Sequence, residues 1–136
     1  MTHFRVDSSV RTIKDRAFYN RMQLVIVILK EELEEIGNGA FRTCELLESI
    51  VIPNAVRAIK DGAFYKCNGL TRVTLGNGLE EIGMNAFREC TSLELIGIPP
   101  TIKAIHDSVF EGCCCFQCEI AIGICVHSLD SLAGVL

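Results

Sequence analysis

The stretch Ile36-Gly37-Asn38-Gly39-Ala40-Phe41-Arg42-Thr43-Cys44 carries the pattern that decides the fold, because its Ile-x-x-x-Ala/Val-Phe core recurs along the chain. The five copies pair Ile13 with Phe18, Ile36 with Phe41, Ile59 with Phe64, Ile82 with Phe87 and Ile105 with Phe110. Successive copies lie 23 residues apart, and no insertion or deletion breaks the count. A fixed period of this size is typical of solenoids, in which each repeat buries its apolar face against its neighbours. The pattern favours an extended binding surface over a catalytic pocket.

One repeat, called a rung below, contains a predicted helical turn and a predicted strand. Ala40, Phe41 and Cys44 have the i, i+1, i+4 spacing of one short helical turn with a single buried side. Ile50 and Ile52 then share one face of a short strand. The sequence therefore predicts an α/β repeat solenoid with short parallel strands and short helical turns.

Apolar residues recur at the same positions in every rung, and we expect them to form columns inside the coil. The predicted columns are Val27/Leu29, Ile50/Ile52, Val73/Leu75 and Ile96/Ile98 on the strands, Leu24, Leu47, Leu70 and Leu93 before them, and Val10, Leu33, Val56, Leu79 and Ile102 after them. The phenylalanine column is the expected centre of the core. We predict one solenoid domain over residues 1–136, with regular rungs at about 4–118 and a degenerate rung or cap at 119–136.

Four of the eight cysteines occupy one repeat position, three residues after the phenylalanine: Cys44, Cys67, Cys90 and Cys113. Free cysteine packs as a small apolar residue, so a buried ladder of thiols is expected. Stacked strands lie ~4.8 Å apart, which permits some disulfides, but parallel Cβ vectors fit the geometry of a disulfide poorly. Reduced thiols are the preferred interpretation, and they favour a cytoplasmic location.

Composition and charge exclude some classes of partner. The chain has 136 residues, 49% of them hydrophobic, and a formal net charge of −4. Nucleic-acid binding requires clustered Lys and Arg, whereas the basic residues here are scattered among Glu and Asp. We see no signal peptide at the start, and the longest apolar run, residues 24–29, is too short to span a membrane.

A second period of 46 residues sets opposite charges beside each other on neighbouring rungs. The expected order is Arg11, Glu34, Arg57, Glu80 and Lys103. Exposed pairs of this kind contribute a few tenths to ~1 kcal/mol each. We interpret this ladder as a solvated structural face rather than as a binding site.

The pattern Leu47-x-x-Ile50-x-Ile52-Pro53-x-x-Val56-x-x-Ile59-x-x-x-Ala63-Phe64-x-x-Cys67-x-x-Leu70 resembles the BspA-like leucine-rich repeat family. The resemblance covers roughly residues 4–118 and departs only at the end rungs, with Arg21 at the cysteine position and with Val109 and Phe116 near the other end. It implies a right-handed, curved solenoid with its strands on the concave side. It also implies a role in protein–protein recognition or adhesion, without catalytic residues.

Commoner leucine-rich repeats carry an asparagine or cysteine column just after the strand. Here that place holds Glu32, Ala55, Gly78 and Thr101, so we expect no asparagine ladder.

Side chains between the buried strand columns should point outward on the concave face. Several of them are apolar, and contiguous exposed apolar surface often marks an interaction site. The alternative is that β-branched residues simply favour parallel strands on both faces. The predicted partner-binding residues are Ile26, Ile28, Ser49, Val51, Arg72, Thr74 and Leu95.

The tail departs from the repeat after Cys113. Cys115-x-x-Cys118 with Cys125 or His127 offers ligands of the right type for tetrahedral zinc, but the second half lacks the usual tight spacing. The alternative is a poor final rung, since Glu119-Ile120-Ala121-Ile122 stands where the next strand belongs, one residue out of phase. We predict no metal and no cofactor.

Catalysis is not indicated either, because His106 lies in an exposed turn without an oriented base or oxyanion donors.

Phe4 and Val6 match the strand columns, so the chain begins within a rung and without a polar cap. An uncapped end favours end-to-end self-association or a place in a longer array. The sequence predicts a non-enzymatic module that binds a protein partner through its strand face. The alternative is a structural segment of a larger adhesive or surface array without its own ligand.

Overall fold

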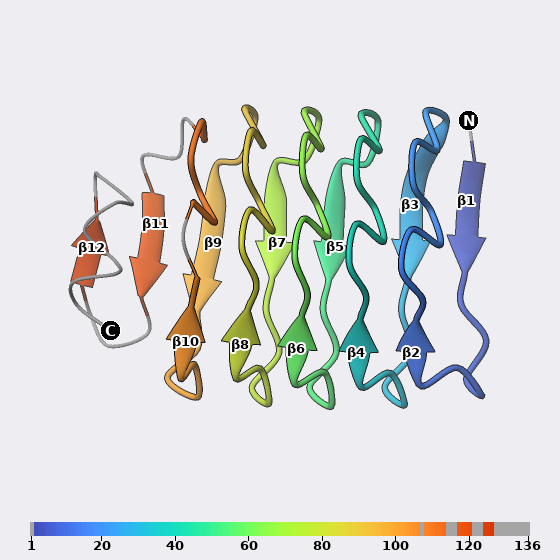
Figure 1. Ribbon diagram of the computed structural model, residues 1–136, viewed down its shortest axis with the longest axis horizontal. Helices are drawn as coiled ribbons and strands as arrows, with labels where there is room; N and C mark the ends of the chain where they lie inside the picture. Colours follow the sequence, from blue (N-terminus) through green and yellow to red (C-terminus); the bar gives the residue numbers. More distant parts are fainter. Residues whose placement is uncertain (1, 107, 114–116, 121–123, 127–136) are drawn as a thin grey trace.

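The computed structural model describes residues 2–106, 108–113, 117–120 and 124–126. The chain winds into rungs that each contribute strands to two sheets on opposite sides of the coil (Figure 1). The seven-stranded sheet contains, in spatial order, β1 (Thr2–Arg5), β3 (Leu24–Ile28), β5 (Ser49–Val51), β7 (Arg72–Thr74), β9 (Leu95–Ile98), β11 (Gln117–Ile120) and β12 (Ile124–Val126). The five-stranded sheet contains β2 (Thr12–Ile13), β4 (Glu35–Ile36), β6 (Ala58–Ile59), β8 (Glu81–Ile82) and β10 (Ala104–Ile105).

Strand register confirms that residues one repeat apart lie beside each other. Ile36 is the parallel partner of both Ile13 and Ile59, and Ser49 is the partner of Arg72. In β11 the register changes, because Cys118 pairs with Ile96 at a separation of 22 residues, one residue out of phase with the repeat. The last strand, β12, then runs antiparallel to β11.

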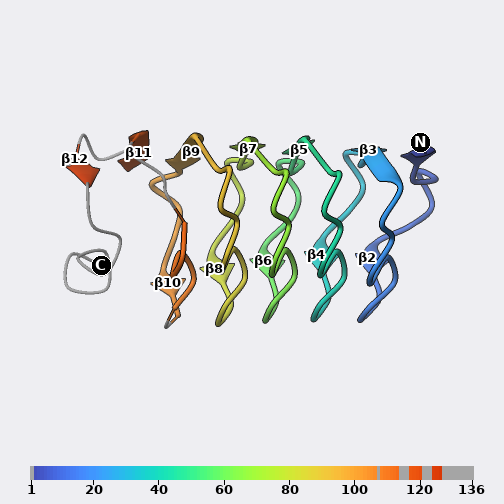
Figure 2. The same cartoon turned by 90° about the horizontal axis from the view of Figure 1, so that it is seen from above.

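Seen from above, the rungs follow one another in an almost straight row (Figure 2). We therefore use the name strand face for the outer face of the seven-stranded sheet, which is the surface predicted to be concave.

The phenylalanine column forms the centre of the core, as predicted. Phe41, Phe64 and Phe87 are fully buried. Their rings stack in parallel, with centroids 5.2 Å apart and interplanar angles of 6° and 1°. The predicted apolar columns are likewise buried, apart from half-buried members at the ends such as Val10 and Ile102.

The predicted helical turns are wrong: the described residues contain no helix, so the class is an all-β parallel solenoid and not α/β. In the second rung the backbone N–H groups alternate between two kinds of acceptor. The N–H groups of Ala40, Arg42 and Cys44 donate to the carbonyl three residues earlier. Those of Gly39, Phe41 and Thr43 donate to Asp61, Ala63 and Tyr65 of the next rung. Hydrogen bonds between rungs therefore use N–H groups that would bond within the segment if it were a helix.

Two residues per rung adopt a left-handed backbone to make this alternation possible. In the second rung they are Gly39 (φ 60°) and Thr43 (φ 58°). The equivalent positions in the other rungs have the same conformation: Arg16, Gly62, Asn85 and Ser108 in one column and Asn20, Lys66, Glu89 and Gly112 in the other. A continuous right-handed helix cannot contain such residues.

The cysteine column is free and hydrogen-bonded, and three of its four members are buried. The Sγ of Cys44 donates to the carbonyl oxygen of Phe18 at 3.0 Å, and that of Cys67 donates to Phe41 at 3.1 Å. Burial raises the pKa of the Cys44 thiol to about 11 and raises that of Cys67 further. The prediction of buried thiols is confirmed for these two residues and for Cys90.

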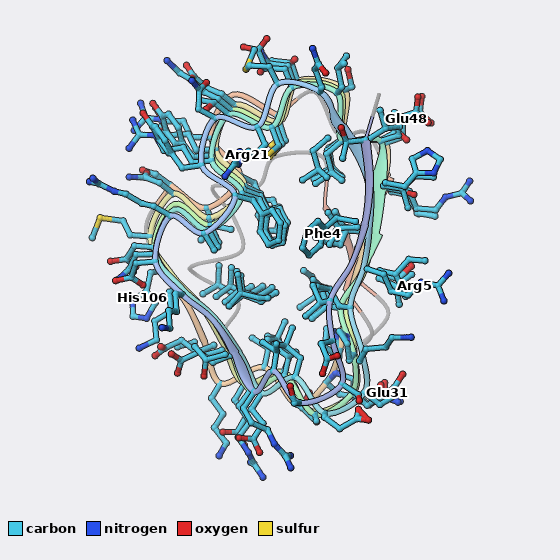
Figure 3. All side chains as sticks on the ribbon, turned by 90° about the vertical axis from the view of Figure 1, so that its right-hand side faces the viewer. Phe4, Arg5, Arg21, Glu31, Glu48 and His106 are labelled. Carbon is cyan, nitrogen blue, oxygen red and sulfur yellow. The ribbon has the colours of Figure 1, made fainter. Side chains whose placement is uncertain are left out.

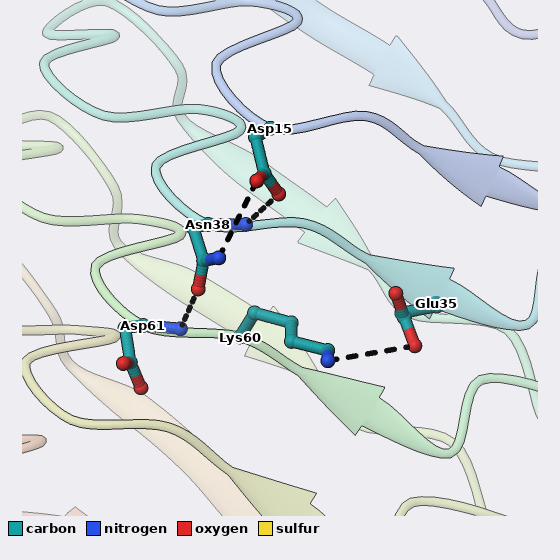
Figure 4. A network of polar contacts seen from close by, with 5 residues as sticks. All are labelled: Asp15, Glu35, Asn38, Lys60 and Asp61. Atoms are coloured by element: carbon teal, nitrogen blue, oxygen red, sulfur yellow. Dashed lines mark hydrogen bonds and ion pairs between the residues drawn. The ribbon is translucent and has the colours of Figure 1, made fainter.

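Polar ladders also join the rungs, and the sequence did not predict them. Asp15 accepts the N–H of Asn38 at 2.8 Å, and the Asn38 side-chain oxygen accepts the N–H of Asp61 at 3.0 Å (Figure 4). Asn54 accepts the N–H of Asn77 at 2.9 Å. This single asparagine pair lies one residue before Ala55 and Gly78 and does not continue into a ladder, because the same column holds Glu31 and Pro100 in the rungs on either side.

The predicted ladder of opposite charges forms in the later rungs. Glu80 pairs with Arg57 at 3.7 Å and with Lys103 at 3.3 Å. The Arg57 and Lys103 side chains are each 74% exposed, so these pairs contribute little to stability.

Candidate partner-binding surface

The seven predicted binding residues all lie on the strand face, in two rows set by strand register. Ile26 pairs with Ser49, Ser49 with Arg72, and Arg72 with Leu95. The second row contains Ile28, and Val51 beside Thr74. Their inward neighbours on the strands are buried, so the alternation along each strand turns these seven side chains toward solvent.

The exposed apolar area is smaller than the predicted set. Ile26, Ile28 and Val51 are 40%, 41% and 63% exposed and lie on the neighbouring strands β3 and β5. We call these three residues the apolar strand patch. Leu95 is 39% exposed but is separated from the patch by β7, which presents Arg72 and Thr74.

Charged groups flank the patch. Viewed along the stack, Arg5 and Glu48 project outward on the strand side, whereas Phe4 points toward the interior (Figure 3). Arg5 lies on β1 as the partner of Ile28, and Arg72 follows Ser49 on the other side. The arrangement is a small apolar patch bordered by charged side chains.

No catalytic or metal centre is found in the part of the chain that the structure describes. His106 is exposed, and its Nε2 lies 3.3 Å from Glu81 Oε2. The described residues hold no group of three His, Cys, Asp or Glu that could bind a metal ion. The candidate zinc ligands Cys115, Cys118, Cys125 and His127 lie outside the described side chains.

The N-terminal end of the stack presents a second apolar surface. Phe4 is 45% exposed and packs edge-on against Phe18, with ring centroids 5.0 Å apart. Beside them lies a hollow of about 620 Å³, also lined by Met22 and Leu24. The first described rung thus leaves Phe4 and part of Phe18 uncovered at this end of the stack.

Sequence reasoning missed one group of surface residues. Between β4 and β5, and at the same place in the other rungs, tyrosine and arginine alternate in one column at Tyr19, Arg42, Tyr65 and Arg88. The 46-residue period that pairs acidic with basic residues also carries this signal, since tyrosine and arginine alternate with the same period.

The described residues include no helix of the length and hydrophobicity that a membrane span requires.

Comparison with known proteins identifies the type of repeat. The model of the BspA type leucine rich repeat region matches residues 1–117 in six copies. A leucine-rich repeat protein of T. pallidum is 33% identical with a TM-score of 0.72, and the match covers 74% of this chain and 47% of that one. A leucine rich cell surface protein from Faecalibacterium prausnitzii is 26% identical with a TM-score of 0.65, covering 88% of this chain and 39% of that one.

The pneumococcal vaccine antigen PcpA shares the fold, with a TM-score of 0.76 at 23% identity over 85% of this chain and 29% of that one. No curated protein matches the sequence. The chain therefore spans less than half the length of each of these three solved structures.

Proposed function

Because the chain belongs to the BspA type leucine-rich repeat family, we propose that it is a non-enzymatic module that binds a protein partner through its strand face. Proteins of this repeat family are generally not enzymes, and no catalytic family is indicated. The observation that carries the proposal is the apolar strand patch, three neighbouring aliphatic side chains that face solvent on a rigid sheet.

The stacked rungs favour binding because they fix the patch in advance. Ile26, Ile28 and Val51 are β-branched and have few rotamers on a strand. A partner that docks there loses little additional freedom in this protein, which leaves more of the apolar contact energy for affinity. Arg5 and Arg72 on the flanking strands would set the orientation of a partner with acidic groups beside an apolar centre.

The experiment is affinity capture from a cell lysate with Ile28→Lys/Val51→Lys as the test variant. Both side chains are exposed, so the substitutions should leave the urea unfolding midpoint unchanged while the captured partner is lost. Leu46→Lys is the matched control, because Leu46 is 50% exposed but lies in the turn that precedes β5. Equal capture by the wild-type protein and the double variant would contradict the proposal.

A second candidate is a structural role as one segment of a larger array. It is favoured by the apolar hollow beside Phe4 and by the free outer edge of β1, which pairs only with β3 among the described strands. The similar cell surface protein contains more chain than this one. Sedimentation velocity at rising concentration tests self-association: growing oligomers that disappear in Phe4→Asp support it, and a constant monomer contradicts it.

A further inference from the structure

The alternating column of tyrosine and arginine forms a cation–π ladder on the turn side of the solenoid. The guanidinium carbon of Arg42 lies 4.7 Å from the ring centroid of Tyr65 and 5.9 Å from that of Tyr19. Lys66 Nζ lies 5.5 Å from the Tyr65 ring. An arginine stacked on an aromatic face keeps its in-plane N–H groups free for an anion. The ladder therefore holds Arg42 in place without satisfying its donors.

A hollow of about 350 Å³ opens beside this ladder and spans three rungs. It is lined by Arg42 from one rung, by Asp61, Gly62 and Tyr65 from the next, and by Met84, Asn85 and Arg88 from the third. Gly62 leaves its floor open, since an added Cβ would meet only the Cβ of Tyr65, at 3.9 Å. Tyr65, in the rung between the two arginines, and the exposed Met84, in the rung of Arg88, offer apolar contact in the same hollow.

Arg88 at the far side of the hollow is incompletely paired. Its Nη2 lies 3.4 Å from Glu111 Oε1, while its buried Nε has no hydrogen-bond partner. The Asn85 side-chain oxygen, in the same lining, is also buried without a partner. A guanidinium binds a carboxylate most strongly through two parallel N–H groups. Because Nε is buried, only the Nη groups of Arg88 can reach a further carboxylate, and Glu111 competes for them inside the protein.

We propose that this hollow is a second binding site, which takes an acidic peptide segment with carboxylates three residues apart in polyproline II conformation. Arg42 and Arg88 belong to one column and lie two rungs apart, and the phenylalanine centroids of neighbouring rungs are 5.2 Å apart, so the two rungs that carry these arginines are about 10 Å apart. Polyproline II repeats every three residues, or ~9.3 Å. Carboxylates at i and i+3 therefore match both arginines, and the residues between them pack on Tyr65 and Met84.

The site differs in chemistry from the apolar strand patch. It is formed by the turns and not by the strands, and charge and stacking dominate it. Under this proposal the protein has two separate docking surfaces, one apolar and one that presents two arginines beside Asp61.

The test is fluorescence anisotropy with a rhodamine-labelled peptide, Glu-Pro-Pro-Glu-Pro-Pro-Glu. Wild-type protein should bind it, more weakly at high salt because exposed charges are screened. Arg42→Gln and Arg88→Gln should each weaken binding about tenfold, the size expected for one charge-assisted contact. Arg11→Gln, which removes an equal charge far from the hollow, should leave binding unchanged.

Two further variants separate a binding site from a structural one. Gly62→Asn should fill the hollow and abolish binding without unfolding the protein, because Asn85 holds the same column position at φ 61°. Glu111→Gln should tighten binding severalfold, because it removes the carboxylate that competes for Arg88.

Any of the following results would overturn the proposal. The first would be that the peptide fails to bind at millimolar protein, or that its binding survives both Arg42→Gln and Gly62→Asn. The second would be that the rearranged peptide Glu-Glu-Glu-Pro-Pro-Pro-Pro binds equally well, which would show a general attraction between opposite charges. The third would be that polygalacturonate binds more tightly than the peptide, which would identify a polysaccharide site.

Discussion

Truncating the central ring of the phenylalanine column, Phe64→Ala, should be among the most destabilising single changes in this protein. The Phe64 ring is fully buried and stacks on Phe41 and Phe87, each with centroids 5.2 Å away. Truncation of a buried phenylalanine costs about 3–5 kcal/mol. The upper part of that range is expected, because cross-rung hydrogen bonds restrain collapse; the Phe64 N–H donates to Ala86 at 2.7 Å.

The matched control is Phe18→Ala in the first rung. Phe18 is only half-buried, so its removal leaves no closed cavity and should cost clearly less. The assay is urea unfolding followed by far-UV circular dichroism for the whole chain. Tyrosine fluorescence provides a second signal, from Tyr19 in the first rung and Tyr65 in the third.

The position of Phe64 makes a second expectation possible. Each rung contacts only its neighbours, so weakening the third rung should uncouple the rungs on either side of it. The two signals should coincide in the wild-type protein and separate in Phe64→Ala. A cost below ~1 kcal/mol, or a cost equal to that of Phe18→Ala, would refute the reasoning.

Three further predictions concern the thiols and the polar ladders. Burial raises the pKa of Cys44 from 9.0 to about 11, so the unfolded chain loses this proton first and stability should be lost as pH rises between those values; Cys44→Ala should reduce that loss in urea titrations. Asn38→Ala keeps the backbone N–H bond to Asp15 but removes the two cross-rung bonds of the Asn38 side chain, from its Nδ2 to Asp15 and to its Oδ1 from the N–H of Asp61, and should cost about 1–2 kcal/mol by thermal unfolding, whereas no measurable cost would show that water replaces them. Glu80→Gln should cost less than about 1 kcal/mol, because both of its partners are largely exposed; a cost above 2 kcal/mol would contradict this.

The columns of the core were predictable because a period without insertions has only one spatial solution. Once Phe41 and Phe64 are known to lie above one another, every residue at the same repeat position must follow. This stacking of equivalent positions predicts that Cys44 and Cys67 are buried. It also predicts that Ile28 and Val51 point outward. The one-residue shift at β11 was also predictable, because Ile120 follows its partner Ile98 by 22 residues and not by 23.

The turn conformation was not predictable from the apolar pattern. Ala40, Phe41 and Cys44 share one buried side in a short helix and also in the alternating turn that forms, so their spacing does not distinguish the two. The distinguishing signal was the column that contains Gly39, Gly62 and Asn85, residue types that tolerate a left-handed backbone.

The candidate site was predictable in position but not in extent. Register placed all seven predicted residues on one face, but only the structure shows that β7 separates Leu95 from the apolar strand patch. The hollow lined by Arg42 and Arg88 was missed because these residues are 46 positions apart in the sequence and come together with Gly62 only in three dimensions.

The most direct test of the stacked-rung account is nuclear magnetic resonance on protein with labelled phenylalanine rings. The account predicts ring-to-ring nuclear Overhauser effects in strict order from Phe18 to Phe41, Phe64, Phe87 and Phe110, since neighbouring centroids lie 5.0–5.8 Å apart. Contacts that skip a rung, such as Phe41 to Phe87, or rings without any mutual contact, would contradict it.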